Sequence, residues 1–409
     1  MINYTAWPEM LAWPYLILQG WLPYRDIAIA HNPLMLLDLV IFFKLFGIGI
    51  TQLKIYTLIL IAINVFLVYF VSNKFWNKKG AYLSSVLYIL LTIVFEGNGL
   101  WFDLALTPFA ILLYYFLRQK NYLWSGIVFA LGFLTKQTFI YFSLPIIFGM
   151  IHDMKSMVSR FKQLVIGSGI TFGVFVIVLY SLGILDDYYN WAIEFGILYL
   201  PNAVGQISFP NLKQIIFSFS PFLILLFTNN LLLTVFTIVG VMGVYPRFEL
   251  FHFQPALPFI AIAISTVIMS QRKMAIKLLI VLFTILFLGF GMYRQLGTNT
   301  RFFESDVEKV VIKINSHQPR IDSLYVINYW DNLYALTNTK PPKPLIPYIP
   351  WYLDYGDNKA SIINGLKTSI PDAVVIGERD ENFSELYQFV DKFYSCNIVD
   401  KKVELCQKN

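Results

Sequence analysis

Asp26 ends the run Gly20-Trp-Leu-Pro-Tyr-Arg-Asp26, which lies just ahead of a chain that repeatedly becomes apolar enough to enter lipid. A carboxylate beside hydrocarbon is costly to keep charged, so it is suited to accept a proton. Asp26 is therefore our first candidate for a general base, with Arg25 and Tyr24 beside it as candidate substrate-binding residues. The structural alternatives are an ion pair with Arg25 or a cap for a helix that begins near Pro33.

Further candidates are spread along the chain at the predicted ends of apolar stretches. Asp103 opens an apolar stretch, where helix capping explains it as well as catalysis does. Lys136 interrupts a long apolar pair, and Arg247 and His252 follow another apolar stretch. An ammonium between two apolar stretches is costly, so Lys136 is expected to be paired or functional. Lipid headgroup contact is the alternative for Arg247, and a hydrogen-bonded loop position is the alternative for His252.

The composition is that of an integral membrane protein, with 57% hydrophobic and only 14% charged residues. The formal charge of +6 is dispersed over short hydrophilic breaks, so it does not indicate a nucleic-acid partner. Cys396 and Cys406 are the only cysteines and flank a predicted hairpin at Asn397–Leu405. They exclude a thiolate metal cluster and make a disulfide feasible.

Apolar stretches predict about ten membrane helices, several of them shorter than the roughly 20 residues of a straight crossing. They are Thr51–Ser72, Gly80–Phe95, Phe102–Leu117, Tyr122–Thr135, Thr138–Ile151, Leu164–Ile184, Leu212–Phe227, Leu231–Tyr245, Gln254–Ser270 and Ala275–Tyr293. Lys and Arg fall in alternate connections, which are therefore predicted to be cytoplasmic. The Asp26 loop and everything after Arg294 are then predicted to face outward. Trp7, Trp13, Trp21 and Trp101 suit either sugar stacking or the interfacial aromatic belt.

The predicted fold class is a polytopic α-helical membrane protein with a small C-terminal extracytoplasmic α/β domain. Residues 1–50 are predicted to form an outer loop with juxtamembrane helices, one of them at 32–46. Residues 51–293 are predicted to form the transmembrane domain, and residues 294–409 the outer domain. Helices are expected at 305–315, 358–369 and 383–393, and strands at 323–328 and 373–377. The Pro-rich bridge 340–351 is predicted to be an extended loop that returns toward the membrane face.

The order of several motifs resembles the GT-C glycosyltransferases, in particular bacterial protein O-mannosyltransferase-like and aminoarabinose-transferase-like enzymes. These motifs are Gly20-x-x-Pro-Tyr-Arg-Asp26 with Asn32-Pro33-Leu34, Leu45-Phe46-Gly47, Phe102-Asp103-Leu104-Ala105-Leu106-Thr107-Pro108, Leu134-Thr135-Lys136-Gln137 and Tyr245-Pro246-Arg247-Phe248 with His252, Pro255 and Pro258. The resemblance covers most of residues 1–293. Family members usually carry a membrane helix ahead of this first loop, and the nearest match to their early acidic pair is Pro8-Glu9.

The resemblance implies a membrane transferase that takes a sugar from a polyprenyl-phosphate donor and passes it to a lipid, glycan or protein acceptor at the extracytoplasmic face of the cell membrane. Asp26 would act as base, Glu9 or Asp103 would orient acceptor or sugar, and Lys136, Arg247 and His252 would bind the phosphate. The sequence assigns no cofactor with certainty. A divalent cation held by the three carboxylates and a metal-free reaction are both compatible with the sequence. The alternative function is a transporter or lipid flippase, in which Asp103, Lys136 and Asn64 would line a path.

Overall fold

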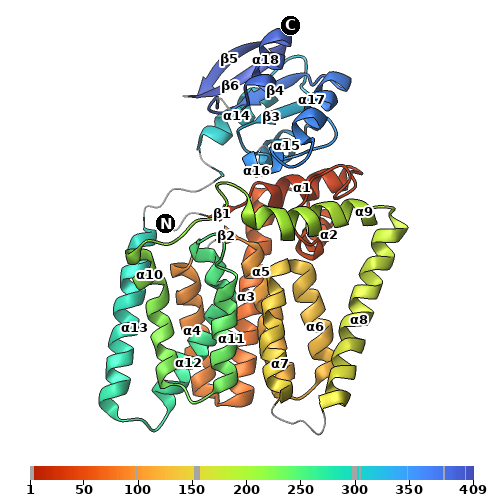
Figure 1. Ribbon diagram of the computed structural model, residues 1–409. Helices are drawn as coiled ribbons and strands as arrows, with labels where there is room; N and C mark the ends of the chain where they lie inside the picture. Colours follow the sequence, from red (N-terminus) through yellow and green to blue (C-terminus); the bar gives the residue numbers. More distant parts are fainter. Residues whose placement is uncertain are drawn as a thin grey trace.

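The computed structural model describes residues 4–97, 99–151, 157–296, 302–303, 305–347, 349–380, 383–400 and 402–409. Three layers follow one another in Figure 1: upright helices, a thin layer of helices lying across their ends, and an α/β domain beyond. The upright helices are α3 (Ile50–Phe75), α4 (Lys78–Val94), α5 (Phe102–Arg118), α6 (Tyr122–Thr135), η1 with α7 (Gln137–Phe142, Ser143–Ile151), α8 (Met157–Ser181), α10 with η5 (Leu212–Phe219, Ser220–Phe227), α11 (Leu231–Met242), η6 with α12 (Leu250–Ala256, Leu257–Met269) and α13 (Met274–Gln295).

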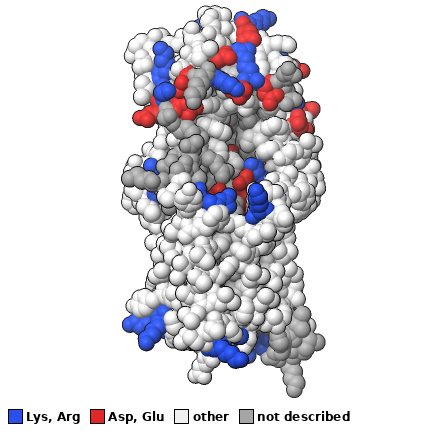
Figure 2. Space-filling view, turned by 90° about the vertical axis from the view of Figure 1, so that its left-hand side faces the viewer, with Lys and Arg blue, Asp and Glu red and all other residues white. Residues whose placement is uncertain are grey.

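These helices lie where the ten apolar stretches predict them. Within the described residues, four are long and apolar enough to cross a membrane: Ile50–Phe75, Met157–Ser181, Leu250–Met269 and Met274–Gln295. The others are shorter, as expected from the lengths of the apolar stretches. On the side of the molecule drawn in Figure 2, a broad band is almost free of charged side chains. Lys and Arg gather at the end of this band away from the α/β domain. The polytopic membrane fold predicted from the sequence is confirmed.

A layer of short elements covers the other ends of these helices. It contains β1 (Thr5–Ala6), α1 (Glu9–Leu18), α2 (Leu34–Phe46), β2 (Gly99–Leu100), α9 (Leu185–Tyr188), the π-helix η3 (Tyr189–Tyr199) and η4 (Leu200–Asn202). The juxtamembrane helix predicted at 32–46 is present as α2. Helix α1 ends at Leu18, and the chain then turns at Gly20, whose φ of 86° is accessible to glycine without strain.

The C-terminal domain is a four-stranded mixed sheet with helices around it, in the order β3-β4-β6-β5. Its elements are α14 (Ser305–Asn315), β3 (Leu324–Ile327), α15 (Asn332–Thr337), α16 (Pro350–Leu353), α17 (Asn358–Thr368), β4 (Ala373–Ile376), α18 (Ser384–Phe393), β5 (Tyr394–Asp400) and β6 (Val403–Lys408). Cys396 and Cys406 are register partners across the β5–β6 hairpin and form a disulfide. The predicted elements are confirmed, whereas α15 and α16 lacked the periodicity needed to predict them. The division of the chain at residues 50 and 293 remains a prediction.

Candidate active site

A parallel pairing of two short strands brings Glu9 and Asp103 to one end of the membrane helices. In the β1–β2 pair, Thr5 is opposite Gly99 and Ala6 is opposite Leu100. Each strand leads directly into a helix, α1 or α5, and Glu9 and Asp103 occupy equivalent places in the two connections. The pairing needs a glycine, because a Cβ at Gly99 would lie 2.4 Å from the carbonyl oxygen of Thr5. Residues 94 apart in the chain therefore start their helices side by side.

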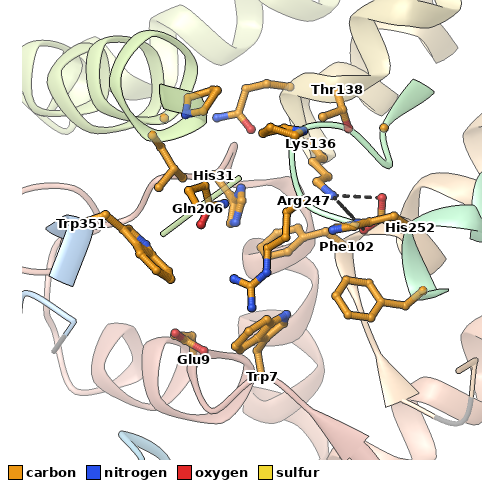
Figure 3. A pocket seen from close by; sticks show the side chains of 18 of the residues that line it. Trp7, Glu9, His31, Phe102, Lys136, Thr138, Gln206, Arg247, His252 and Trp351 are labelled. Carbon is orange, nitrogen blue, oxygen red and sulfur yellow. Dashed lines mark hydrogen bonds and ion pairs between the residues drawn. The ribbon is translucent and has the colours of Figure 1, made fainter. Parts of the chain in front are cut away.

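A cavity of about 210 Å³ lies where these connections meet the covering layer and the C-terminal domain. Its wall includes the acidic Glu9 and Asp103, the basic Lys136 and Arg247, and His252 (Figure 3). Further lining side chains are Trp7, Trp13, His31, Phe102, Gln137, Gln206, Phe251, Ile349, Trp351 and Tyr352. Five of the eight site residues predicted from the sequence therefore share one enclosed space.

Asp103, Lys136 and His252 form a buried ionic cluster at one end of the cavity. The Nζ atom of Lys136 lies 3.0 and 2.8 Å from the two carboxylate oxygens of Asp103, and Nδ1 of His252 lies 2.8 Å from Oδ2. Lys136 occupies the break between α6 and η1, as the polar interruption of that apolar pair predicts. His252 is fixed by its neighbour Phe251, whose ring stacks on Trp101 at 4.2 Å. The cluster thus presents an ammonium whose charge is balanced by one carboxylate.

Glu9 lies at the other end of the cavity, between Trp7 and Trp351 in Figure 3. Its Oε2 atom is buried and has no hydrogen-bond partner. Burial raises the pKa of the Glu9 carboxyl to about 7, while a backbone hydrogen bond opposes that increase. A carboxylate with a pKa near neutrality and a free lone pair is well suited to take a proton from an incoming hydroxyl.

Arg247 reaches into the space between the two ends. Its guanidinium lies 5.8 Å from the ring centre of Trp7 and 5.9 Å from that of Trp351. One guanidinium nitrogen is 3.6 Å from Glu249, so the pairing is loose. Two indole faces thus hold a planar cation in the cavity, where it can reorient toward an anion.

Asp26, the first candidate for a general base in the sequence, does not line this cavity. Its Oδ2 is 2.7 Å from Nζ of Lys343 and accepts the backbone N–H of Leu22 at 2.9 Å. Its partner lies 317 residues away in the sequence, in the Pro-rich bridge. The carboxylate therefore serves a contact between the covering layer and the C-terminal domain. The ion pair with Arg25, the structural alternative considered for Asp26, is absent among its described contacts.

Arg25 and Tyr24 are likewise directed elsewhere. Arg25 pairs with Asp187 at 2.9 Å and donates to the carbonyl oxygen of Gly183. Tyr24 is buried and its hydroxyl donates to the carbonyl oxygen of His31 at 2.9 Å. Neither lines the cavity. Their contacts hold the outer loop against α9 and its neighbours.

His31 and Gln206 are cavity residues that were not singled out in the sequence. The ring of His31 packs 4.4 Å from that of Phe102, and burial, followed by the charge of Lys136, lowers the His31 pKa to about 3. His31 is therefore a neutral hydrogen-bonding group. His31 lies just before Asn32-Pro33, in the outer loop that contains the candidate Asp26. That position could have identified it as a candidate from the sequence. Gln206 lies in an irregular loop and carried no such signal.

Within the described residues, the one group of three or more potential metal ligands is Cys396, Glu404 and Cys406. None of the three lines this cavity, and the two cysteines are joined in a disulfide. The suggested cation held jointly by Asp26, Glu9 and Asp103 does not fit the geometry, because Asp26 is outside the cavity and Asp103 is bound to Lys136.

The sequence and the fold are similar to those of known proteins. Residues 30–180, less than half of the chain, match the family model described as dolichyl-phosphate-mannose-protein mannosyltransferase. The structure of ArnT from Cupriavidus metallidurans in the apo state aligns with a TM-score of 0.65 at 12% identity, over 98% of this chain and 92% of that one. ArnT bound to undecaprenyl phosphate aligns with a TM-score of 0.62 at 12% identity, over 97% and 92% of the two chains.

The oligosaccharyltransferase AglB from Archaeoglobus fulgidus, in complex with an inhibitory peptide and a dolichol-phosphate, aligns with a TM-score of 0.48 at 13% identity, over 90% of this chain and 65% of that one. No curated protein matches the sequence. The likeness to ArnT, at 12% identity, shows a shared fold. The resemblance to the GT-C membrane glycosyltransferases is thus confirmed, and the chain has their fold over nearly its whole length.

Proposed function

We propose that the protein transfers a sugar from a polyprenyl-phosphate donor to an acceptor bound in the cavity, at the extracytoplasmic face of the membrane. The observation that carries this proposal is the meeting of a buried, unpartnered carboxylate oxygen on Glu9 with the cations Lys136 and Arg247 in one enclosed space. A base and an anion-binding group are the two functions that such a transfer requires.

In the proposed reaction an acceptor hydroxyl attacks the anomeric carbon while the bond from that carbon to the phosphate oxygen breaks. Glu9 takes the hydroxyl proton, and the bonding electrons leave with the polyprenyl phosphate. Arg247 stabilises the charge that builds on the departing phosphate, because its guanidinium is held by ring faces and only loosely by Glu249. Lys136 contributes from the other side, with Asp103 and His252 fixing its position. Glu9 thus replaces Asp26 as the proposed base.

The orientation rests on charge. Basic residues lie at the ends of the membrane helices remote from the α/β domain, among them Lys74, Lys78, Arg118, Arg160 and Arg272. By the positive-inside rule this end is cytoplasmic. The cavity and the C-terminal domain are then on the outer face of a cell membrane.

A transporter is less consistent with the geometry. Asp103 is in the first turn of α5, Lys136 follows the last residue of α6, and His252 precedes α12, so the ionisable cluster is at helix ends and not at the middle of the bundle. Asn64, the third residue of the predicted path, is buried, donates to the carbonyl oxygen of Leu104 and does not line the cavity. Transport sites are expected near the bilayer midplane.

The test is to reconstitute the protein in vesicles with a panel of radiolabelled polyprenyl-phosphate sugars and to supply a membrane extract as acceptor. A transferase cleaves the donor and leaves label on an acceptor together with free polyprenyl phosphate. A flippase moves the intact labelled donor between leaflets without cleaving it. Label that crosses but stays on the donor would overturn the proposal.

A further inference from the structure

Three polar atoms of residues that line the cavity are buried without a hydrogen-bond partner. They are the acceptor atoms Oε2 of Glu9 and Oε1 of Gln206, and the donor Nε1 of Trp13. All three residues line the same cavity. Buried polar groups in native proteins are nearly always paired, so several unpaired groups in one cavity indicate a polar ligand that pairs with them. The ligand must donate at two points and accept at one, as a molecule with several hydroxyl groups does.

Around Glu9 the cavity is walled by flat apolar surfaces. Trp351 and Trp7 lie on either side of Glu9 in Figure 3, and Tyr352 contributes to the wall. Indole rings offer large, rigid contact area at small conformational cost. The C–H face of a pyranose packs on such a ring while its hydroxyls reach hydrogen-bonding groups at the edge. Flat walls with unpaired polar atoms between them are suited to a sugar ring.

An extended peptide would need a different surface. One common mode of binding an extended peptide uses a row of unpaired backbone groups at a strand edge. Here the unpaired atoms belong to side chains of α1 and of the loop carrying Gln206, and those side chains do not form such a row.

We propose that the cavity formed by Glu9, Trp13, Gln206 and Trp351 is an acceptor subsite for a saccharide, whose hydroxyl receives the transferred sugar. This inference rests on the function proposed above and names its acceptor class. The saccharide stacks on Trp351, accepts a hydrogen bond from Nε1 of Trp13 and donates to Gln206 and Glu9. The hydroxyl that donates to Glu9 is the one that attacks. Free oligosaccharides and glycolipid headgroups share this chemistry.

The C-terminal domain supplies Trp351 through the Pro-rich bridge, which is tied to the outer loop at both ends. Leu345 N donates to the carbonyl oxygen of Asp26 at 2.8 Å, and Ala28 N donates to that of Leu345 at 2.9 Å. Further along, Ala30 N donates to the hydroxyl of Tyr352 at 3.3 Å. The ion pair between Lys343 and Asp26 adds to the first tie. Asp26 is thus a positioning residue for the wall that carries Trp351.

The first experiment measures saccharide binding without any donor, so that it does not depend on transfer. Quenching of tryptophan fluorescence is recorded with soluble disaccharides of hexose and N-acetylhexosamine, with vesicles containing a disaccharide-bearing lipid, and with a Ser/Thr-containing peptide. We expect one of the two saccharide sources to bind, and comparison of the soluble and vesicle arms identifies which. Wild-type protein that binds neither saccharide source, or only the peptide, would overturn the proposal.

The second experiment compares variants in transfer with the donor saturating. Trp351→Ala should raise the acceptor KM at least tenfold and the donor KM by a smaller factor, because Arg247 keeps its contact with Trp7. Trp351→Tyr should recover most of both losses because it restores a ring face. Trp13→Phe keeps an aromatic ring but removes the indole N–H that donates a hydrogen bond to the saccharide. It should raise the acceptor KM severalfold. The control is Trp124→Ala, an indole 49% exposed on α6 and absent from the cavity wall. An unchanged acceptor KM in Trp351→Ala would overturn the subsite, even if transfer itself is intact.

Discussion

The Nζ atom of Lys136 lies within 3.0 Å of both carboxylate oxygens of Asp103, and the two side chains are 8% and 3% exposed. The ammonium comes from the break between α6 and η1, and the carboxylate from the first turn of α5. Neither charge could be buried alone at this depth, because an unpaired buried ion is strongly destabilising. The pair therefore fixes two membrane helices relative to each other and holds a cation at the cavity wall.

Removing one partner of this pair should cost more than removing both. Lys136→Met leaves the Asp103 carboxylate buried with His252 as its only remaining partner among the contacts described here, and is expected to destabilise the protein by about 3–5 kcal/mol. The double variant Asp103→Leu with Lys136→Met should recover much of that loss and remain inactive. Thermal unfolding in detergent together with the transfer assay measures both effects. A Lys136→Met protein as stable as wild type would contradict the conclusion that Lys136 and Asp103 form a stabilising buried ion pair.

Arg247 should act on the donor. Arg247→Ala is expected to lower kcat/KM for the donor about 10- to 100-fold, the range for loss of a charge-assisted hydrogen bond. Arg247→Lys keeps the charge but loses the planar fork and the fit between the two indoles, so partial activity is expected. Steady-state kinetics with varied donor at saturating acceptor check this. An effect confined to the acceptor KM would instead place Arg247 in the acceptor subsite.

Asp26 should prove dispensable for the chemical step. Asp26→Asn removes the ion pair with Lys343 but keeps the backbone hydrogen bonds of the bridge, and an ion pair this exposed is worth about 1 kcal/mol or less. We expect kcat to stay within about threefold of wild type and the acceptor KM to rise modestly. Lys343→Gln should behave in the same way. Loss of kcat in Asp26→Asn alone would restore Asp26 as the base.

The helices were predictable because their signal is local. Apolar runs predicted all ten upright segments, and alternating or helical periodicity predicted the α14, β3, α17, β4 and α18 elements of the outer domain. The return of the Pro-rich bridge to the outer loop was also expected, and the backbone bonds between Leu345 and residues 26–28 confirm it.

The site was predicted only in part, because contacts between distant residues leave no local trace. Asp26 stood in the most distinctive motif, but its partner Lys343 could not be identified from the chain. Glu9 is a single carboxylate at the start of a short helix, and its importance depends on the pairing of Thr5 with Gly99. Lys136 was recognisable because an ammonium between apolar stretches is costly in any fold.

The rate should depend on pH through Glu9. Its carboxylate is the reactive form, and its pKa is raised to about 7 by burial, so the reactive form is lost as the pH falls through 7. The expected profile of kcat/KM rises about tenfold per pH unit below 7 and levels off above it. Transfer measured between pH 5 and 9 gives this profile. An acidic limb centred near the ordinary value of 4.5 would show that the titrating group is exposed and is not Glu9.

The most direct test compares Glu9→Gln with Glu385→Gln, the same change at an exposed position in α18 of the outer domain. Both proteins are assayed for sugar transfer at pH 8 with donor and acceptor saturating. The account predicts wild-type turnover for Glu385→Gln and a fall in kcat of about 100- to 10,000-fold for Glu9→Gln, with the donor still bound. Equal turnover by the two variants would contradict it.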